Sequence, residues 1–192
     1  MKDLTVLLCS HRTRGTAKKL VEIIKGYTEF DIEIVSFDKV KLEACIMCNR
    51  CGGTKGCARY MEDDFNGILE KLKLSRTILV ISPLYALIPS KFAAFLDRLT
   101  SVTYFSQLRN ADDIPLQGKR CGVICYDSSG RNKDLECIIK NVLKPNIEGF
   151  ADIKCTNDFD FIADVQSEIT DIVTYVEAYV KENCDEIFKK AF

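Results

Sequence analysis

The fold is decided by residues 4–16, which read LTVLLCSHRTRGT. The first six of these residues form a nearly continuous apolar run, which is typical of a strand buried on both faces of a parallel sheet. A polar loop follows from Ser10 to Gly15, and from Thr16 to Gly26 the apolar residues recur at helical spacing. The stretch therefore predicts a strand, a loop and a helix, which is the repeating unit of an α/β sheet.

This alternation of apolar runs and helical patterns continues along the chain. Strands are predicted at residues 32–37, 77–81, 118–126 and 150–155, and helices at residues 65–74, 90–99, 134–143 and 165–188. We therefore predict a single domain over residues 1–192, a three-layer α/β/α, doubly wound, five-stranded parallel sheet. Ligands of such sheets bind beyond the carboxyl ends of the strands, where the strand order reverses.

Composition and charge exclude several classes of partner. With 27 basic and 28 acidic residues the formal net charge is -1, so no electrostatic footprint for nucleic acid or an anionic membrane stands out. No apolar run approaches the ~20 residues that span a bilayer, and the N-terminal run indicates a strand rather than a signal peptide. We therefore expect a cytoplasmic protein with neither a nucleic-acid nor a membrane partner, in which the ten cysteines stay reduced.

The loop after the first strand has the chemistry of a phosphate site. Backbone N–H groups at the start of a helix favour an anion. The hydroxyls and arginine forks of Ser10-His11-Arg12-Thr13-Arg14-Gly15-Thr16 complete a cradle for a dianion. The loop lacks both the Gly-Lys-Ser/Thr ending of a P-loop and the Gly-x-Gly-x-x-Gly pattern. It therefore suits a mononucleotide such as FMN, and the alternative is a helix N-cap flanked by two solvated arginines.

A cysteine run carries the most specific pattern in the sequence. It lies in a long connection, a cysteine-rich insertion loop at about residues 40–63, and has the spacing C-x2-C-x2-C-x5-C at Cys45, Cys48, Cys51 and Cys57. Four thiolates in a local run of this kind hold iron–sulfur clusters, so we predict a [4Fe–4S] cluster here. Two alternatives stay open: a structural zinc ion, and a loop of free or disulfide-forming thiols without metal.

Two further polar loops follow buried strands. The first begins with Ser82-Pro83-Leu84-Tyr85-Ala86, where proline stiffens the backbone and Tyr85 offers a planar face to a flavin ring. A simple strand-to-helix connection is an equal alternative for this segment. The second loop, Tyr126-Asp127-Ser128-Ser129-Gly130-Arg131-Asn132, is a polar turn that by itself indicates no function.

Taken in chain order, these loops resemble the flavodoxin-like NAD(P)H-dependent FMN reductase superfamily, most closely its iron–sulfur flavoprotein branch. The resemblance covers residues 1–135 and is carried by Ser10-x-Arg12-x-x-Gly15-Thr16, the cysteine run with Asp63-Asp64, Ser82-Pro83-Leu84-Tyr85 and Phe92-x-x-Phe95-Leu96-Asp97-Arg98. The last two segments are typical of flavin binding in this fold. The chain departs from the family at Met47, where a small residue is usual, and at residues 126–130, which are usually richer in glycine.

The resemblance implies a role for each loop. The FMN phosphate would be bound by Ser10, Arg12 and Thr16, with help from Arg14 and Gly15. The isoalloxazine ring would be lined by Pro83, Leu84, Tyr85 and Ala86, and bordered on its other edge by Asp127, Ser128, Ser129 and Gly130. The cluster would be ligated by Cys45, Cys48, Cys51 and Cys57, near a flavin and often across a subunit interface.

The implied activity is electron transfer through FMN and a [4Fe–4S] cluster, from ferredoxin or NAD(P)H to a small-molecule or protein acceptor. No side chain stands out as a general acid or base, which is consistent with chemistry done by the flavin. One alternative is an NAD(P)H-dependent FMN or quinone reductase without a cluster. Another is a non-enzymatic flavodoxin-like electron carrier, or a thiol or zinc redox sensor. A homodimer or homotetramer is expected, with Phe92, Phe95, Tyr104 and Phe105 either at the subunit interface or in the core.

Overall fold

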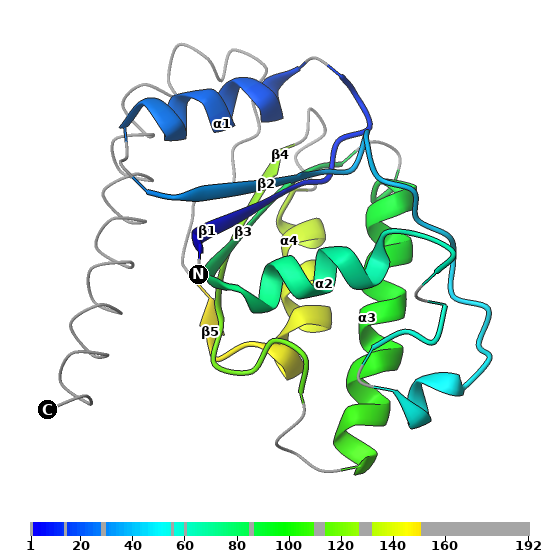
Figure 1. The fold of residues 1–192 in the computed structure, drawn as a ribbon. Helices are drawn as coiled ribbons and strands as arrows, with labels where there is room; N and C mark the ends of the chain where they lie inside the picture. The colour runs from blue at the N-terminus through cyan, green and yellow to red at the C-terminus, as the bar shows by residue number, and fades with distance from the viewer. Residues whose placement is uncertain are drawn as a thin grey trace, which may run out of the picture.

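The computed structural model describes residues 2–13, 15–27, 30–54, 56–59, 61–84, 87–109, 114–126 and 132–150. These residues form an all-parallel, five-stranded sheet with the strand order β2-β1-β3-β4-β5 (Figure 1). Its strands are β1 (Lys2–Leu8), β2 (Ile32–Ser36), β3 (Ser75–Pro83), β4 (Arg120–Tyr126) and β5 (Gly149–Phe150). The predicted doubly wound parallel sheet is confirmed, and its strand order is the flavodoxin-like one.

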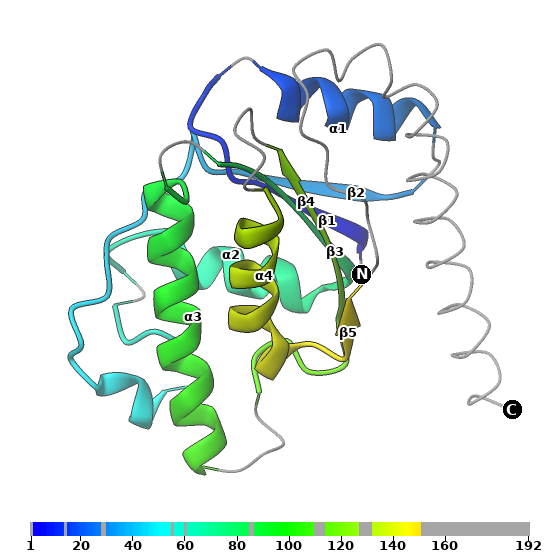
Figure 2. The same ribbon diagram turned by 180° about the vertical axis from the view of Figure 1, so that it is seen from behind.

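Helices cover both faces of this sheet. They are α1 (Thr16–Tyr27), α2 (Phe65–Lys73), α3 (Ser90–Arg109) and α4 (Asn132–Leu143), with short 3-10 helices η1 (Arg50–Gly53) and η3 (Lys144–Asn146). Among these, α1 lies on one face, and α2, α3 and α4 lie on the other (Figures 1 and 2). The three predicted layers are therefore confirmed.

Each buried strand contributes side chains to two cores, because successive residues of a strand point to opposite faces. On one face, Leu4, Val6 and Leu8 of β1 pack with the apolar side of α1. On the other face, Leu7 of β1 and Val80 of β3 pack with the apolar sides of α2, α3 and α4. A strand that supplies both cores is apolar at consecutive positions, which explains the continuous apolar run near the N-terminus.

Four phenylalanines form the centre of the larger core. The ring of Phe37 packs edge-on against Phe92 and Phe95, with centroid separations of 5.6 Å and 6.0 Å. The ring of Phe65 lies 5.4 Å from that of Phe95, and all four side chains are 0% exposed. The core alternative is therefore confirmed for Phe92 and Phe95, whereas Tyr104 is 56% exposed.

Helix α3 is longer than the sequence predicts, since it continues past residue 99 to Arg109. The inner face of its second half is partly polar, because Thr103 and Ser106 are buried there beside Val102. The hydroxyl of Thr103 lies within hydrogen-bond distance of the Leu99 carbonyl, at 2.8 Å, and of the Asn146 side chain, at 2.6 Å. The prediction ends the helix at residue 99 because the helical spacing of apolar residues stops there. Beyond that point the buried side of the helix includes hydroxyl side chains that form hydrogen bonds.

Two predicted elements reach beyond the described residues. The described part of β5 ends at Phe150, where the predicted strand begins. The predicted helix at residues 165–188 lies outside the described residues altogether. In the part of the chain that the structure describes, no helix is both long enough and apolar enough to cross a membrane.

Replacing Phe95 with alanine is expected to lower the free energy of unfolding by about 3–5 kcal/mol, since removing a fully buried ring leaves a cavity. Leu108→Ala in the same helix is the matched control, because that side chain is 65% exposed. The control should change the free energy of unfolding by less than about 0.5 kcal/mol. Chemical denaturation followed by circular dichroism measures both values, and equal losses would contradict the placement of Phe95 in the core.

Candidate functional site

The strand order reverses between β1 and β3, so the carboxyl ends of these two strands mark the ligand-binding edge of this topology. The two ends are joined directly, because the N–H of Cys9 donates to the carbonyl of Ile81 at 3.0 Å. The chain leaves β1 through the loop to α1, and it leaves β3 through the loop to α3. Both loops therefore begin side by side at the centre of the sheet.

The loop from β1 to α1 is folded around the hydroxyl of Ser10. This residue is only 8% exposed, and its side-chain oxygen accepts a hydrogen bond from the N–H of Arg12 at 3.1 Å. Gly15 has a φ of +155°, which side chains rarely adopt, and a Cβ there would meet no atom within 4 Å. Ser10, Arg12 and Gly15 thus come together just before α1, whose first residue is Thr16. The predicted phosphate residue Arg14 lies outside the described residues.

The start of α1 fits an anion rather than a cation. Its first turn contains no acidic residue, and the unpaired N–H groups of a helix's first turn carry partial positive charge. Arg12 and Thr13 are exposed beside this turn. A phosphate group bound here would therefore meet guanidinium, hydroxyl and backbone N–H donors.

The loop from β3 to α3 starts at the same edge. Pro83 is buried at the end of β3, and the N–H of Leu84 donates to the carbonyl of Tyr126 at 3.0 Å, which ties the loop to β4. The structure thus places two predicted ring-lining residues, Pro83 and Leu84, at the same edge as the loop from β1 to α1. The other predicted residues of the flavin ring site lie outside the described residues: Tyr85, Ala86, Asp127, Ser128, Ser129 and Gly130.

Lys91, in the first turn of α3, connects this edge to both neighbouring loops. Its N–H donates to Nε2 of His11 at 3.4 Å, and its ammonium group donates to the carbonyl of Val40 at 2.7 Å. Burial lowers the pKa of His11, and the charge of the Lys91 ammonium lowers it further. The imidazole is therefore neutral at pH 7 and can accept the hydrogen bond from Lys91.

The four cysteines of the run line one small cavity beside α3. Cys51 and Cys57 are buried, while Cys45 and Cys48 are partly exposed. The structure thus brings together all four predicted ligands, a donor set suited to a thiolate-bound metal. The cavity measures about 20 Å³, room for about one water-sized atom, so a cuboidal cluster would require the loop to open. Within the described ranges, no group of three or more His, Cys, Asp or Glu side chains is placed to hold a metal ion, these cysteines included, so a single metal ion would also require the thiols to rearrange.

The cysteine loop bends at two residues with left-handed backbone conformation. Met47 has a φ of 51° and Asn49 a φ of 57°. Asparagine tolerates this conformation, whereas for most other side chains it costs about 1–2 kcal/mol. The side chain of Met47 is 71% exposed, so packing does not offset that cost. The departure from the family pattern at Met47 therefore falls on a strained position.

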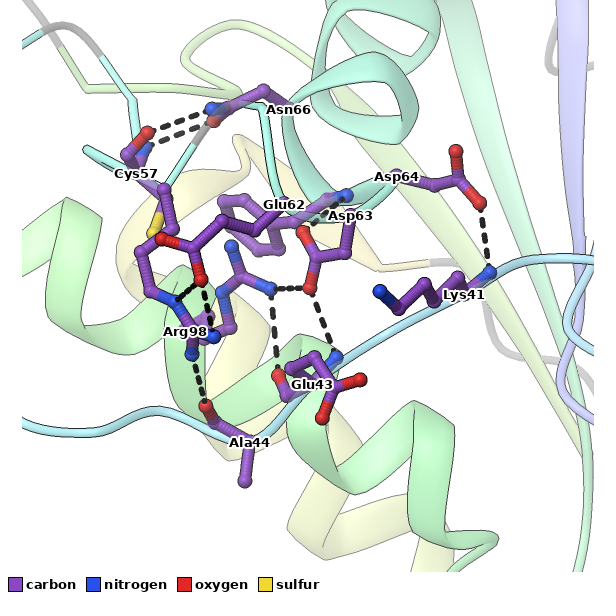
Figure 3. Close-up of polar contacts among 11 residues, drawn as sticks. Lys41, Glu43, Ala44, Cys57, Glu62, Asp63, Asp64, Asn66 and Arg98 are labelled. Carbon is purple, nitrogen blue, oxygen red and sulfur yellow. Dashed lines mark hydrogen bonds and ion pairs between the residues drawn. The ribbon is translucent and has the colours of Figure 1, made fainter.

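A buried ion pair between Asp63 and Arg98 fastens the cysteine loop to α3 (Figure 3). Both side chains are 1% exposed. The carboxylate of Asp63 also accepts hydrogen bonds from the N–H groups of Glu43, at 2.9 Å, and Phe65, at 3.2 Å. Nη1 of Arg98 donates in addition to the carbonyl of Glu43 at 3.3 Å. One carboxylate thus joins the first part of the loop, the start of α2 and the middle of α3.

Two further contacts hold the second half of the loop. The N–H of Cys57 donates to Oδ1 of Asn66 at 2.8 Å, and Nδ2 of Asn66 donates to the Cys57 carbonyl at 2.7 Å (Figure 3). Gly56 is required beside this pair, because a Cβ there would lie 2.7 Å from Oδ1 of Asn66. The side chain of Arg109 donates to the Cys51 carbonyl at 2.5 Å. The backbone of two predicted metal ligands is therefore fixed by α2 and α3.

The groups of this site shift one another's pKa values. Burial raises the pKa of Asp63, but the hydrogen bond from Arg98 and those from two backbone N–H groups hold it below its usual value. Burial raises the pKa of the Cys51 thiol, and the neighbouring sulfur of Cys57 raises it further. The backbone N–H and the guanidinium of Arg50 lower the pKa of Cys48. Cys48 therefore loses its proton more readily than Cys51.

Sequence reasoning missed the role of Arg98 in the cysteine site. The resemblance places this residue in a segment typical of flavin binding, whereas the structure pairs it with Asp63 behind the cysteines. A signal was available, since Arg98 follows Phe95 by one helical turn on the apolar side of a predicted helix. A cation in that position requires a buried partner. The contact between Asn66 and Cys57 has no comparable signal in the sequence.

The comparison with protein families agrees with this arrangement. A family model described as NADPH-dependent FMN reductase matches residues 3–138, which is more than half of the chain. The protein is a flavin-dependent oxidoreductase, so the non-enzymatic alternatives are not favoured. Within that class, the chain belongs to the NADPH-dependent FMN reductase family. This match supports the predicted superfamily and does not distinguish the iron–sulfur branch.

Solved structures share the fold at low sequence identity. RosB with bound 8-demethyl-8-formylriboflavin-5'-phosphate is 12% identical, with a TM-score of 0.65, 100% of this chain covered and 88% of that chain. FerB, a flavoenzyme NAD(P)H:(acceptor) oxidoreductase from Paracoccus denitrificans, is 15% identical, with a TM-score of 0.56 and coverages of 93% and 98%. General stress protein 14 from Treponema denticola, in complex with FMN, is 12% identical, with a TM-score of 0.51 and coverages of 93% and 99%. A comparison with curated proteins gives no match.

Asp63→Asn is expected to lower the free energy of unfolding at pH 7 by about 3–5 kcal/mol, because it leaves the buried Arg98 guanidinium unpaired. Folding lowers the pKa of Asp63, so its contribution is fully present above the unfolded pKa and is lost as the pH falls through the folded value. The wild-type chain should therefore lose more stability than the variant between about pH 5 and pH 2.

Urea denaturation at a series of pH values measures this difference. Asp64→Asn serves as the control, since the neighbouring Asp64 is exposed and pairs with the backbone of Lys41 rather than with a buried cation. Parallel stability curves for the wild type and Asp63→Asn would contradict the assignment of Asp63 as an ionised partner of Arg98.

Proposed function

We propose that this chain is an NAD(P)H-dependent reductase that passes electrons from a reduced nicotinamide, through bound FMN, to a flavin or quinone acceptor. The observation that carries the proposal is the loop after β1. There the buried hydroxyl of Ser10, the open approach at Gly15 and the carboxylate-free start of α1 lie together at the edge between β1 and β3. Membership of the NADPH-dependent FMN reductase family supports the same cofactor.

The residue roles in this proposal follow the two loops. The phosphate residues are Ser10, Arg12, Arg14, Gly15 and Thr16. The ring residues are Pro83, Leu84, Tyr85 and Ala86, with Asp127, Ser128, Ser129 and Gly130 on the other edge of the ring. Bound flavin phosphates in two proteins of this fold, RosB and general stress protein 14, support a mononucleotide site of this kind.

Bound FMN supplies the hydride-accepting and electron-transferring chemistry. The chain's own residues bind and orient it. Ser10 is held in place by the N–H of Arg12, so its hydroxyl is fixed before a ligand arrives. Because His11 is neutral at pH 7, the positive charge next to the phosphate would come from Arg12, Arg14 and the start of α1. Pro83 and the hydrogen bond from Leu84 to Tyr126 hold the start of the ring-side loop against β4.

The electron donor and acceptor in the proposal are small molecules. FerB, which shares the fold, is an NAD(P)H:(acceptor) oxidoreductase, and this supports a reduced nicotinamide as the donor. Oxidation of NADH or NADPH with FMN or a benzoquinone as the acceptor, followed at the nicotinamide absorption band, tests the activity directly. A purified chain that retains FMN but oxidises neither nicotinamide would contradict the proposal.

Ser10→Ala and Arg12→Ala are each expected to weaken FMN binding about ten- to hundredfold. A hydrogen bond to a charged group contributes about 1.5–3 kcal/mol, which corresponds to that range. Fluorescence quenching of FMN during titration of the apoprotein measures the dissociation constant. Lys19→Ala is the matched control, because Lys19 is an exposed residue of α1 one turn beyond the phosphate loop. Wild-type affinity in both loop variants would rule out this loop as the phosphate site.

A second candidate function is that of an iron–sulfur flavoprotein, in which a [4Fe–4S] cluster exchanges electrons with FMN and ferredoxin serves as a donor. One observation favours it: Cys45, Cys48, Cys51 and Cys57 line the same cavity. Two of the four thiols are partly exposed, so a larger group would enter from the solvent side of the loop. The four thiols would be its ligands. Iron and sulfide analysis of anaerobically purified protein tests this candidate.

Cys48→Ser is expected to abolish the visible absorption of the cluster while FMN stays bound, because a hydroxyl is a poor substitute for a thiolate ligand. The absorption spectrum together with the iron content measures the first effect, and the flavin released on denaturation measures the second. Cys137→Ser is the control, since Cys137 is an exposed cysteine of α4 outside the loop. Loss of both the cluster and FMN in Cys48→Ser would instead mean that the loop has a structural role.

A further inference from the structure

Of the three nitrogens of the Arg98 guanidinium, one donates to neighbouring oxygen atoms and two do not. Its Nη1 donates to Asp63 and to the Glu43 carbonyl. Nε and Nη2 are also buried, yet they have no hydrogen-bond partner among the described residues. The whole side chain is 1% exposed and forms part of the wall of the four-cysteine cavity. Two charged N–H donors are thus buried in the wall of the cavity, with the weakly accepting sulfur of Cys57 beside them.

Buried N–H donors without a good acceptor lower the stability of the fold unless a bound ligand accepts their hydrogen bonds. An unsatisfied buried donor costs about 1–3 kcal/mol, and a donor on a charged group costs more. The ring of Phe65 lies 4.4 Å below the guanidinium carbon and stabilises the face of the cation, but it does not satisfy the N–H groups at the edge. The thiol of Cys57 lies beside the guanidinium, since burial lowers the pKa of Arg98 whereas Asp63 and the contact with this thiol raise it.

The chemistry of sulfur decides what can satisfy these donors. A neutral thiol is a weak acceptor, whereas a thiolate is anionic and accepts charge-assisted hydrogen bonds. Cysteines become thiolates when they bind a metal. The second cation in the cavity wall, Arg59, is already paired with Glu62 at 2.6 Å and with the carbonyl of Ala44 at 3.2 Å. Of these two cations, Arg98 is the one with donors left for sulfur.

We propose that Arg98 is a positioning residue of a metal–thiolate site, whose Nε–H and Nη2–H donate to the sulfur of Cys57 when the four cysteines bind metal. Asp63 sets the orientation, because its bond to Nη1 turns the remaining donors toward the cavity. The inference rests on the second candidate function, metal binding by the four thiols. The role of Arg98 is the same whether the four thiolates bind an iron–sulfur cluster or a single zinc ion, because the sulfur is anionic in both cases.

The experiment compares the wild type with Arg98→Lys, which keeps the charge beside Asp63 but removes the planar fork of donors. Each apoprotein is loaded anaerobically in two arms, with ferrous iron and sulfide or with Zn²⁺, and metal retention is measured by competition with a chelator. Loss of an outer partner of a metal ligand costs about 10- to 100-fold in affinity, so Arg98→Lys should bind metal at least about tenfold more weakly. In the iron arm the midpoint potential should also fall, because hydrogen bonds to sulfur raise it.

Arg59→Lys is the matched control. It makes the same substitution in the wall of the same cavity, at a residue whose donors are already used, and its metal affinity should equal that of the wild type. A second variant, Asp63→Asn combined with Arg98→Met, removes both buried charges together and so avoids an unpaired charge. It should fold, as judged by its melting temperature, and show the same loss of metal as Arg98→Lys.

The outcomes separate the inference from the function on which it rests. A wild type that retains neither iron nor zinc overturns metal binding and the role of Arg98 together. A wild type that binds metal, with equal affinity and an equal midpoint potential in Arg98→Lys, overturns the role of Arg98 alone. Weaker binding in both arms supports a donor to a metal thiolate of either kind, and weaker binding in one arm identifies which metal the site holds.

Discussion

The parallel pairing of β1 with β3 is the constraint on which both sites depend. These two strands are neighbours in the sheet although β2 lies between them in the chain. From β1 the chain adds β2 on one side, and it then adds β3, β4 and β5 on the other side. All five strands are parallel, and their carboxyl ends therefore meet at one edge. The loop that contains Ser10 and Arg12 leaves β1 at that edge, and the cysteine loop leaves β2 beside it. One pairing thus brings the proposed FMN-phosphate loop and a group of thiols to the same end of the molecule.

The sheet was predictable from the sequence because its strands are buried on both faces. Such strands are apolar at consecutive positions, as at Leu7 and Leu8, and polar loops separate them from amphipathic helices. The second half of α3 was not predictable in this way, since Thr103 and Ser106 replace apolar residues on its buried side. The cysteine spacing predicted that the four thiols lie together. It could not predict that Asp63 and Arg98 meet behind them, because that contact depends on how α2 and α3 pack.

The cysteines of the sheet and those of the cysteine loop differ in chemistry. Cys9, Cys121 and Cys125 are 0% exposed and act as small apolar residues of the sheet. Burial raises the pKa of Cys121 to about 12, so its thiol stays protonated and unreactive at neutral pH. Cys48, by contrast, is partly exposed beside Arg50, which lowers its pKa. Of these two groups of cysteines, the loop thiols are therefore the reactive ones, since burial keeps the sheet thiols away from solvent.

The contacts of α3 make this helix and the cysteine loop a transferable unit. Lys91 and Arg98 are seven residues apart, or about two helical turns, so they lie on the same side of α3. Lys91 binds the carbonyl of Val40 where the loop begins, and Arg98 binds Asp63 where it ends. A graft of residues 40–64 into another flavodoxin-like scaffold would therefore have to carry these two side chains of α3 with it, together with Asn66 and Arg109, which hold the second half of the loop.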